Sequence, residues 1–145
     1  MEIRKGLPQD YPSAMELIAE FSEEALAEYG TYLDPDRLKE TFDSAYPTSF
    51  ALVHEDKVVG ILAGRIGNDI CSKRPVYEEL VWFMTKKFRR HGMKLLNHAE
   101  GWCRDKHISR ITMCCMHNSV TEKLWALYTK MGYRPMETRF IKELD

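Results

Sequence analysis

The sequence predicts an α/β fold in which a mixed β-sheet carries helices on both of its faces. Apolar segments typical of strands alternate with amphipathic helical segments, in the order βααββ, then β-turn-α, then βα and β. The 145 residues are 44% hydrophobic and 30% charged, a composition typical of a globular domain and not of a disordered chain. This length suits one core, so we expect residues 1–145 to form a single domain.

The N-terminal part supplies one strand and two helices. Residues 2–5 form the first predicted strand, and apolar residues at helical spacing from Met15 to Ala25 predict the first helix. Asp34 followed by Pro35 predicts the start of the second helix. An acidic N-cap accepts a backbone N–H, and proline suits the first helical position.

The middle of the chain extends the sheet. Residues 49–54 and 57–66 read as two strands, and the short link at residues 55–56 predicts a hairpin. A polar loop at residues 67–75 leads to a long apolar strand at residues 76–84. We expect these three strands to be neighbours in the sheet.

A cationic turn follows the long strand. Residues 86–92 read KKFRRHG and lead directly into an amphipathic helix predicted from Gly92 to Lys106. The first N–H groups of a helix lack partners within it and carry partial positive charge, and the arginines and lysines add to that charge. Taken alone, the run could be a solvated loop, but its place between strand and helix favours a site for a phosphate-bearing ligand.

The last third repeats the pattern. Residues 110–116 predict a buried strand, and residues 119–122 have capping-box spacing at the start of a helix that Gly132 ends as its C-cap. Residues 133–135 and 138–142 supply the final strand or strands. We therefore expect the C-terminal part of the chain to supply the last strands of the sheet.

Composition also excludes some functions. The net charge of −1 argues against nucleic acid and anionic membranes as partners, and no apolar stretch approaches the roughly 20 residues of a membrane span. The start of the chain lacks the apolar core of a signal peptide. The four cysteines have no CxxC or zinc-ligand spacing, so we expect reduced thiols, no metal and a cytoplasmic location.

Two motifs, taken with the order of elements, resemble the GCN5-related N-acetyltransferase (GNAT) superfamily. One is the turn Arg89-x-x-Gly92, and the other is Asn118 followed by LYTKMGY at residues 127–133. The resemblance extends over nearly the whole chain. The turn departs from the family pattern, because either Lys94 replaces the second glycine or the loop is about two residues shorter.

The resemblance implies a fold and an activity. The fold is a twisted, mostly antiparallel sheet of six to seven strands, with about four helices on both faces and a splay between strands 4 and 5. The activity is transfer of an acetyl group from acetyl-CoA to a primary amine, either a small molecule or a lysine or N-terminal amine, by direct attack in a ternary complex. A homodimer is common in the superfamily.

The resemblance also assigns the acetyl-CoA site. Backbone groups at the end of the long strand would pair with the pantetheine arm, and the basic turn would hold the pyrophosphate. The residues assigned in this way are Trp82, Phe83, Met84, Arg89, Arg90, His91, Gly92, Met93, Lys94, Leu95, Asn118 and Tyr128.

Three residues are candidates for catalysis. Tyr128 matches the family tyrosine that protonates the departing thiolate, and Glu79 or Glu78 would be the base that deprotonates the amine. Successive strand residues point to opposite faces, so the two carboxylates cannot share a role. The competing interpretations are a core tyrosine and two exposed strand charges. The alternative function on the same fold is a non-catalytic module that binds or senses acyl-CoA.

Overall fold

The computed structural model describes residues 1–30, 32–118 and 120–145. The chain divides into two compact units, Met1–Cys114 and Cys115–Asp145. The expectation of a single domain over residues 1–145 stays a prediction. In the described part of the chain, no helix is long and apolar enough to cross a bilayer.

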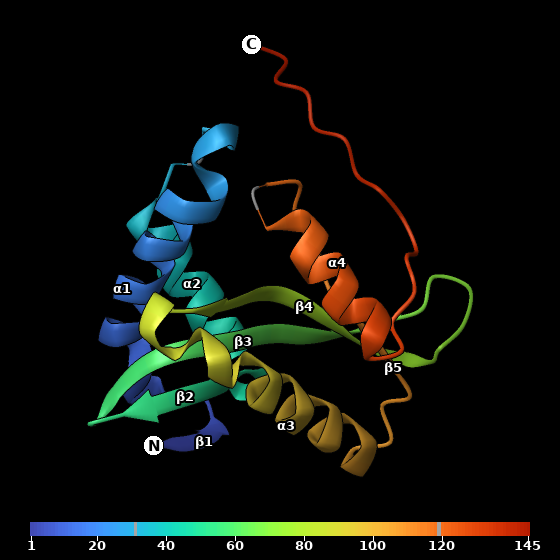
Figure 1. The fold of residues 1–145 in the computed structure, drawn as a ribbon, viewed down its shortest axis with the longest axis horizontal. Helices are drawn as coiled ribbons and strands as arrows, with labels where there is room; N and C mark the ends of the chain where they lie inside the picture. The colour runs from blue at the N-terminus through green and yellow to red at the C-terminus, as the bar shows by residue number, and fades with distance from the viewer. Residues whose placement is uncertain (31, 119) are drawn as a thin grey trace. The chain divides into compact units, whose positions relative to one another are not determined.

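The first unit is built on a five-stranded mixed sheet (Figure 1). Its strands lie in the order in which they occur along the chain: β1 (Glu2–Lys5), β2 (Phe50–His54), β3 (Lys57–Asn68), β4 (Pro75–Met84) and β5 (Arg110–Thr112). The pairs from β1 to β4 are antiparallel, and β5 runs parallel to β4. The parallel pair needs a crossover, which the helix between β4 and β5 supplies.

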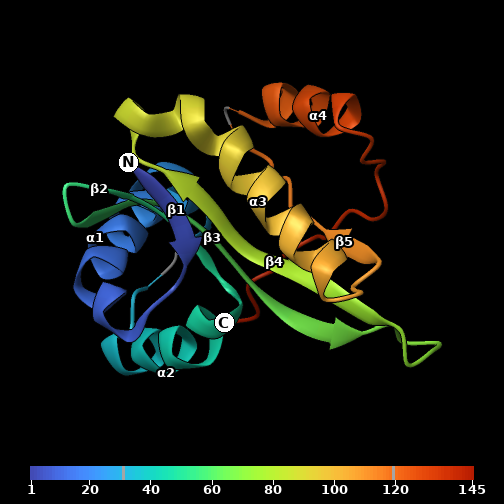
Figure 2. The same ribbon diagram turned by 90° about the horizontal axis from the view of Figure 1, so that it is seen from below.

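Helices cover both faces of this sheet (Figure 2). The α-helices are α1 (Tyr11–Phe21), α2 (Pro35–Ala45) and α3 (Gly92–Asp105) in the first unit, and α4 (Thr121–Lys130) in the second. Shorter turns are η1 (Pro8–Asp10), η2 (Ser22–Leu26), η3 (Ala27–Tyr29), η4 (Tyr46–Thr48) and η5 (Lys86–His91). In the first unit, α1 and α2 lie on one face and α3 lies on the other.

Each face of the sheet has its own apolar core. On the first face, Leu17 of α1 packs in a cluster that includes Val53 of β2 and Phe83 of β4. On the second face, the ring of Trp102 on α3 lies 5.5 Å from that of Phe50 and 6.2 Å from that of Tyr77, centroid to centroid. Because Phe83 and Tyr77 belong to the same strand, β4 contributes to both cores.

Two local signals of the sequence are confirmed in the structure. The Asp34 carboxylate accepts the backbone N–H of Arg37 at 2.9 Å, as expected of an N-cap. The hairpin between β2 and β3 turns through Glu55 and Asp56, whose φ angles are 50° and 60°. Positive φ at both turn residues matches the twist of the flanking strands.

The predicted number of strands is wrong: in the part of the chain that the structure describes, the sheet has five strands, not six to seven. The segment predicted as a strand at residues 110–116 is a strand only from Arg110 to Thr112. Residues 133–135 and 138–142 carry no strand either, although their strand pattern is clear. A strand needs a hydrogen-bonded neighbour, and the described part of the second unit contains no strand to supply one.

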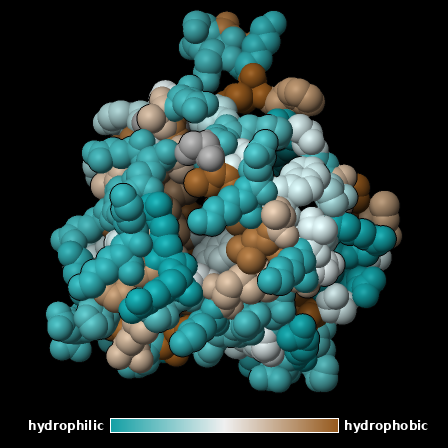
Figure 3. Space-filling model, viewed as in Figure 1, coloured by the Kyte–Doolittle hydropathy of each residue, from teal (hydrophilic) through white to brown (hydrophobic). Residues whose placement is uncertain are grey.

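The second unit contains α4 and the tail that follows it. Ser119, the first residue of the predicted capping box, lies outside the described residues. Gly132 follows the end of α4 with a φ of +91°, the left-handed conformation expected after a helix. The tail leaves apolar side chains exposed, among them Met136, Phe140 and Leu144. On the face seen in Figure 3, apolar residues lie in small groups among hydrophilic ones.

We predict opposite effects for two glycine-to-alanine substitutions. A Cβ on Gly64 would lie 2.4 Å from Cζ of Tyr77, a buried ring whose hydroxyl donates to Thr48 O at 2.7 Å. Because this ring cannot move away, Gly64→Ala should lower the free energy of unfolding by about 1–3 kcal/mol. Around Gly101, inside α3, no atom apart from its chain neighbours and the nearby helix backbone lies within 4 Å of the position that a methyl would take. Gly101→Ala should therefore raise the free energy of unfolding by up to ~1 kcal/mol.

Urea unfolding of the two variants beside the parent protein measures both changes. Equal effects of the two substitutions would show that Tyr77 does not hold β3 and β4 together as the structure indicates.

Candidate active site

The candidate site lies on β4, where one extra residue changes which way the side chains point. Val81 lies opposite Ala63 of β3. The next β3 residue, Gly64, lies opposite Glu79, which makes Leu80 a β-bulge. A bulge redirects the side chains that follow it. Val81 therefore packs against the core of the α1 face, whereas Glu79, opposite Gly64, lies on the α3 face.

The outer edge of β4 is paired over only part of its length. β5 pairs with β4 at residues 76–78, and β4 continues to Met84. Thr85 N–H donates to Val59 O of β3 at 3.0 Å. Hydrogen bonding alternates along an antiparallel pair, so the backbone N–H and C=O groups of Met84 and Trp82 turn away from β3. These are backbone groups that the family resemblance assigned to the pantetheine arm.

Phe83, also assigned to the cofactor, lies differently. Its backbone pairs with Ile61 of β3, and its ring packs 5.5 Å from that of Phe21 in the core of the α1 face. The alternation that turns the backbone of Trp82 and Met84 outward turns the backbone of Phe83 toward β3. Phe83 therefore supports this edge from the core.

Glu79 is a buried carboxylate at the point where β4 and β5 separate. Glu79 is only 8% exposed, and its Oε2 accepts the backbone N–H of Cys114 at 2.7 Å. Burial raises the pKa of Glu79 to about 7, and hydrogen bonds from the backbone and side chain of Cys114 oppose that rise. A carboxyl group with this pKa can exchange a proton near neutral pH.

Glu78 points to the opposite face, as strand alternation predicts. Its Oε2 accepts from Nε of Arg65 on β3 at 2.9 Å, in an ion pair that is partly exposed. The structure therefore separates the two candidate bases, with Glu78 in a surface ion pair and Glu79 buried at the end of the β5 ladder.

The cationic turn forms η5 and runs into α3 at Gly92. A Cβ on Gly92 would lie 3.4 Å from the ring of Trp82, so this glycine lets the start of α3 approach β4 closely. The N–H of Gly92 donates to Arg89 O within the turn. One of the donors assigned to the pyrophosphate is thus already bonded. Met93 and Lys94 lie in the first turn of α3, and Leu95 is fully buried.

Arg89 is held by the protein itself. Its guanidinium forms an ion pair with Glu24 of η2, donates from Nε to Met84 O at 3.4 Å and lies 5.8 Å from the centre of the Phe83 ring. Arg89 therefore links η5 to η2 and to the end of β4. The resemblance assigned Arg89 to the acetyl-CoA site, but the structure gives the charge of this side chain a protein partner.

Arg90 and His91 lie next to each other at the end of η5. Nε of Arg90 donates to Nε2 of His91 at 3.2 Å. Desolvation lowers the pKa of His91, and the neighbouring charges of Arg90 and Lys94 lower it further. A neutral histidine beside these cations keeps the positive charge of the turn on the arginine and lysine side chains.

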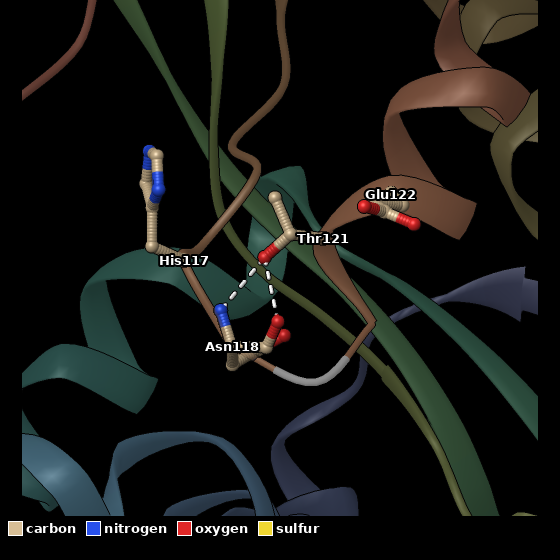
Figure 4. Close-up of a pocket in the computed structure, with 4 residues that line it drawn as sticks. All are labelled: His117, Asn118, Thr121 and Glu122. Atoms are coloured by element: carbon tan, nitrogen blue, oxygen red, sulfur yellow. Dashed lines mark hydrogen bonds between the residues drawn. The ribbon is translucent and has the colours of Figure 1, made fainter.

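Asn118 lies in the second unit, in an open pocket of about 500 Å³ lined by His117, Asn118, Thr121 and Glu122 (Figure 4). Oγ1 of Thr121 accepts the N–H of Asn118 at 2.7 Å and lies 2.8 Å from its carbonyl oxygen. Oδ1 of Asn118 accepts the N–H of Val120 at 3.0 Å. These bonds order the turn that leads into α4, a role that is compatible with the predicted contact to pantetheine.

Tyr128 also belongs to the second unit, on α4. Its ring lies 5.4 Å from that of Tyr133, and its carbonyl oxygen accepts the N–H of Tyr133 at 2.9 Å. The motif LYTKMGY thus forms the last turns of α4 and the chain that follows Gly132. The role of Tyr128 as the acid stays a prediction.

Sequence reasoning missed two residues that the structure brings to the site. Cys114 falls in the strand predicted at residues 110–116, but its N–H donates to the Glu79 carboxylate. Glu24 of η2 pairs with Arg89, 65 residues away. No sequence signal connects such distant partners. Among residues 1–30, 32–118 and 120–145, no group of three His, Cys, Asp or Glu side chains could hold a metal ion.

Comparison with protein-family models gives one match. The model of the acetyltransferase (GNAT) family matches residues 13–133, which is most of the chain. No curated protein sequence matches the chain significantly.

Solved structures of several acetyltransferases resemble this one at low sequence identity. An aminoglycoside acetyltransferase from an uncultured soil metagenomic sample, in complex with trehalose, has a TM-score of 0.74 at 18% identity over 99% of this chain and 96% of that chain. A ribosomal-protein-alanine N-acetyltransferase from Brucella melitensis biovar Abortus 2308 has a TM-score of 0.75 at 12% identity over 99% and 98%. An aminoglycoside N-acetyltransferase in complex with CoA has a TM-score of 0.68 at 15% identity over 99% of each chain. At these identities the likeness concerns the fold.

The burial of Glu79 predicts a pH-dependent stability. Its pKa is about 7 in the folded protein against a usual 4.5, so folding favours the protonated form and stability is lost as pH rises between these values. The loss amounts to roughly 3 kcal/mol. Glu79→Gln lacks this loss, so its free energy of unfolding relative to the parent should rise by that amount between pH 4.5 and pH 8.

Urea unfolding across this pH range measures the difference, with Glu78→Gln as the matched control. Glu78 lies in a partly exposed ion pair, so its substitution should change stability by less than about 1 kcal/mol at every pH. If the difference in free energy of unfolding between Glu79→Gln and the parent did not change with pH, the Glu79 carboxyl group of the parent would titrate as an ordinary glutamate.

Proposed function

This chain belongs to the acetyltransferase (GNAT) family, and from that premise we propose that it transfers an acetyl group from acetyl-CoA to a primary amine. The proposed reaction is direct attack of the amine on the thioester within a ternary complex. One observation carries the proposal: a buried carboxyl group, Glu79, lies where β4 and β5 separate and has a pKa of about 7.

An amine acceptor requires such a base. An alkyl ammonium has no lone pair with which to attack a carbonyl carbon, so a proton must leave before the C–N bond forms. Glu79, ionised above its pKa, would accept this proton directly or through one water molecule. Glu78 is the weaker candidate, because it lies on the opposite face in an ion pair with Arg65.

Two features of the first unit suit the acetyl-CoA donor. The outward-facing backbone of Trp82 and the outward-facing N–H of Met84 can bind an extended amide-containing chain as an added strand would, while Met84 O accepts from Arg89. Beyond Met84, the turn carries Lys86, Lys87 and Arg90 toward the start of α3. The partial positive charge at the start of a helix repels nearby cations. The negative charge of a bound pyrophosphate would offset that repulsion.

The remaining steps need a donor to the oxyanion and an acid for the leaving group. Backbone N–H groups at the end of β4 are candidates for the first role. For the second, we propose the phenol of Tyr128, which would protonate the thiolate as the C–S bond breaks. The proposed contact of Asn118 with pantetheine belongs to the same motif.

The acceptor is proposed only as a class. Neighbours in fold are named as acetyltransferases of aminoglycosides and of a ribosomal-protein alanine, all of which present an amine. In this chain, η2 carries Glu23 and η3 carries Glu28, and carboxylates attract a cationic amine. A non-catalytic acyl-CoA sensor is the second candidate, favoured by the ion pair that engages Arg89 with Glu24.

We predict turnover when the protein is supplied with acetyl-CoA and a panel of primary amines. The kcat/KM measured from release of the CoA thiol should rise with pH up to about 7, because the base must be ionised. Glu79→Gln should lower kcat/KM by roughly 10²- to 10³-fold, whereas Glu78→Gln should change it less than about twofold.

Thiol release and calorimetry separate the two candidate functions. Tight binding of CoA without thiol release over the whole panel would favour the sensor, and loss of activity in Glu78→Gln but not in Glu79→Gln would reverse the assignment of the base.

We predict a matched difference between two tyrosines of the second unit. Tyr128→Phe removes only the proposed acid and should lower kcat about tenfold or more, with little change in the KM for acetyl-CoA. Tyr133→Phe removes the hydroxyl from the ring 5.4 Å away and should leave kcat within about twofold. If Tyr128→Phe kept the full rate across the pH range, another group or water would be the acid.

A further inference from the structure

Four side chains join the end of α1 to the cationic turn η5. The ring of Phe21, the last residue of α1, lies 5.5 Å from the ring of Phe83 on β4. Three residues later, Glu24 of η2 forms an ion pair with Arg89 of η5, whose guanidinium lies 5.8 Å from the Phe83 ring. Nε of Arg89 also donates to Met84 O at 3.4 Å. The contacts of Arg89 therefore hold η5 both to η2 and to the end of β4.

The turn that Arg89 anchors has a strong charge of one sign. Lys86, Lys87, Arg89 and Arg90 lie within five consecutive residues, and the start of α3 adds partial positive charge. Like charges at this spacing repel one another and oppose a compact turn. Glu24 brings a carboxylate to this turn from a different element, η2, which continues α1 as a π turn. Such turns are rare and are often found at functional sites.

We propose that Glu24 is a positioning residue for the acetyl-CoA site: through Arg89 it holds η5 at the end of β4, so that the cations of the turn are in place before the pyrophosphate binds. This inference rests on the proposed function, because it concerns the donor of that reaction. Glu24 lies outside the motifs that the resemblance assigned to the cofactor. It acts through Arg89 and not by contact with either substrate.

The proposal predicts a change in CoA affinity opposite to the one that charge alone predicts. Loss of the Glu24 carboxylate would reduce repulsion of the pyrophosphate and free the charge of Arg89, so Coulomb's law alone predicts tighter binding. If Glu24 orders the turn, binding must instead supply that order, and CoA binds more weakly. The side chains of Arg89 and Glu24 are 45% and 43% exposed, so water screens the charge effect and the cost of ordering should dominate.

The first test measures the order of the turn in the protein without ligand. Hydrogen exchange at the backbone amides of residues 86–91 should be roughly three- to tenfold faster in Glu24→Gln and in Arg89→Gln than in the parent. Glu20→Gln is the matched control, because it removes the same charge from α1 four residues earlier. It should leave these rates unchanged. Exchange within α3 and β4 should stay at the parent rate in all three variants, which separates a local effect from general unfolding.

The second test measures CoA binding by calorimetry. The Kd for CoA should rise about three- to tenfold in Glu24→Gln and stay within about twofold in Glu20→Gln. If Glu24 acts through Arg89, Glu24→Gln should have no further effect on the Kd when it is added to Arg89→Gln. A merely structural role for Glu24 would lower stability without this dependence on Arg89.

Two results would overturn the proposal. One is parent-like exchange of residues 86–91 in Glu24→Gln, and the other is CoA binding that is unchanged or tighter in that variant. The exchange measurement needs neither CoA nor acetyl transfer, so it stands apart from the proposed function. Faster exchange in Glu24→Gln, with no binding of CoA to the parent, would contradict the assignment of this turn to acetyl-CoA and not the ordering of the turn by Glu24.

Discussion

The arrangement of this site depends on one constraint, the extra residue Leu80 in β4. Without it, side chains would alternate regularly along the strand, and Val81 would lie on the same face as Glu79. The bulge instead turns Val81 and Phe83 into the core under α1, while Glu79 and Trp82 lie on the α3 face. One strand can therefore contribute to two cores and still offer an edge to a ligand.

Where β4 and β5 separate, backbone groups lose their partners in the ladder, and one of them bonds the carboxylate of the candidate base. A continued ladder would have satisfied the N–H of Cys114 with a backbone carbonyl. Here a side-chain carboxylate takes that role, and its burial favours the protonated form. A carboxylate exposed to water is stabilised in its ionised form, but it is a weak base at neutral pH. Burial of Glu79 therefore makes it a stronger base, but ionisation of the buried carboxyl group lowers the stability of the fold.

Local features of this fold were predictable from the sequence, whereas long-range ones were not. Asp34 at a helix start and the turn at Glu55 and Asp56 act within a few residues, so the sequence predicts them correctly. The bulge at Leu80 arises from the register with β3, and no pattern within LVWFM marks it. The C-terminal strands were overpredicted because strand propensity at residues 138–142 does not supply a hydrogen-bonded neighbour.

The pair of Arg89 and Glu24 explains how the basic turn can fold before any ligand binds. Five cations near the start of α3 would repel one another and the helix dipole. The carboxylate of Glu24 neutralises the charge of Arg89, and a hydrogen bond to Met84 O holds the Arg89 guanidinium at the end of β4. The neighbouring charges of Lys86, Lys87, Arg90 and Lys94 are then held on a turn whose position is already set. An anion that binds there gains their attraction without having to order the turn, because the Arg89 contacts have already done so.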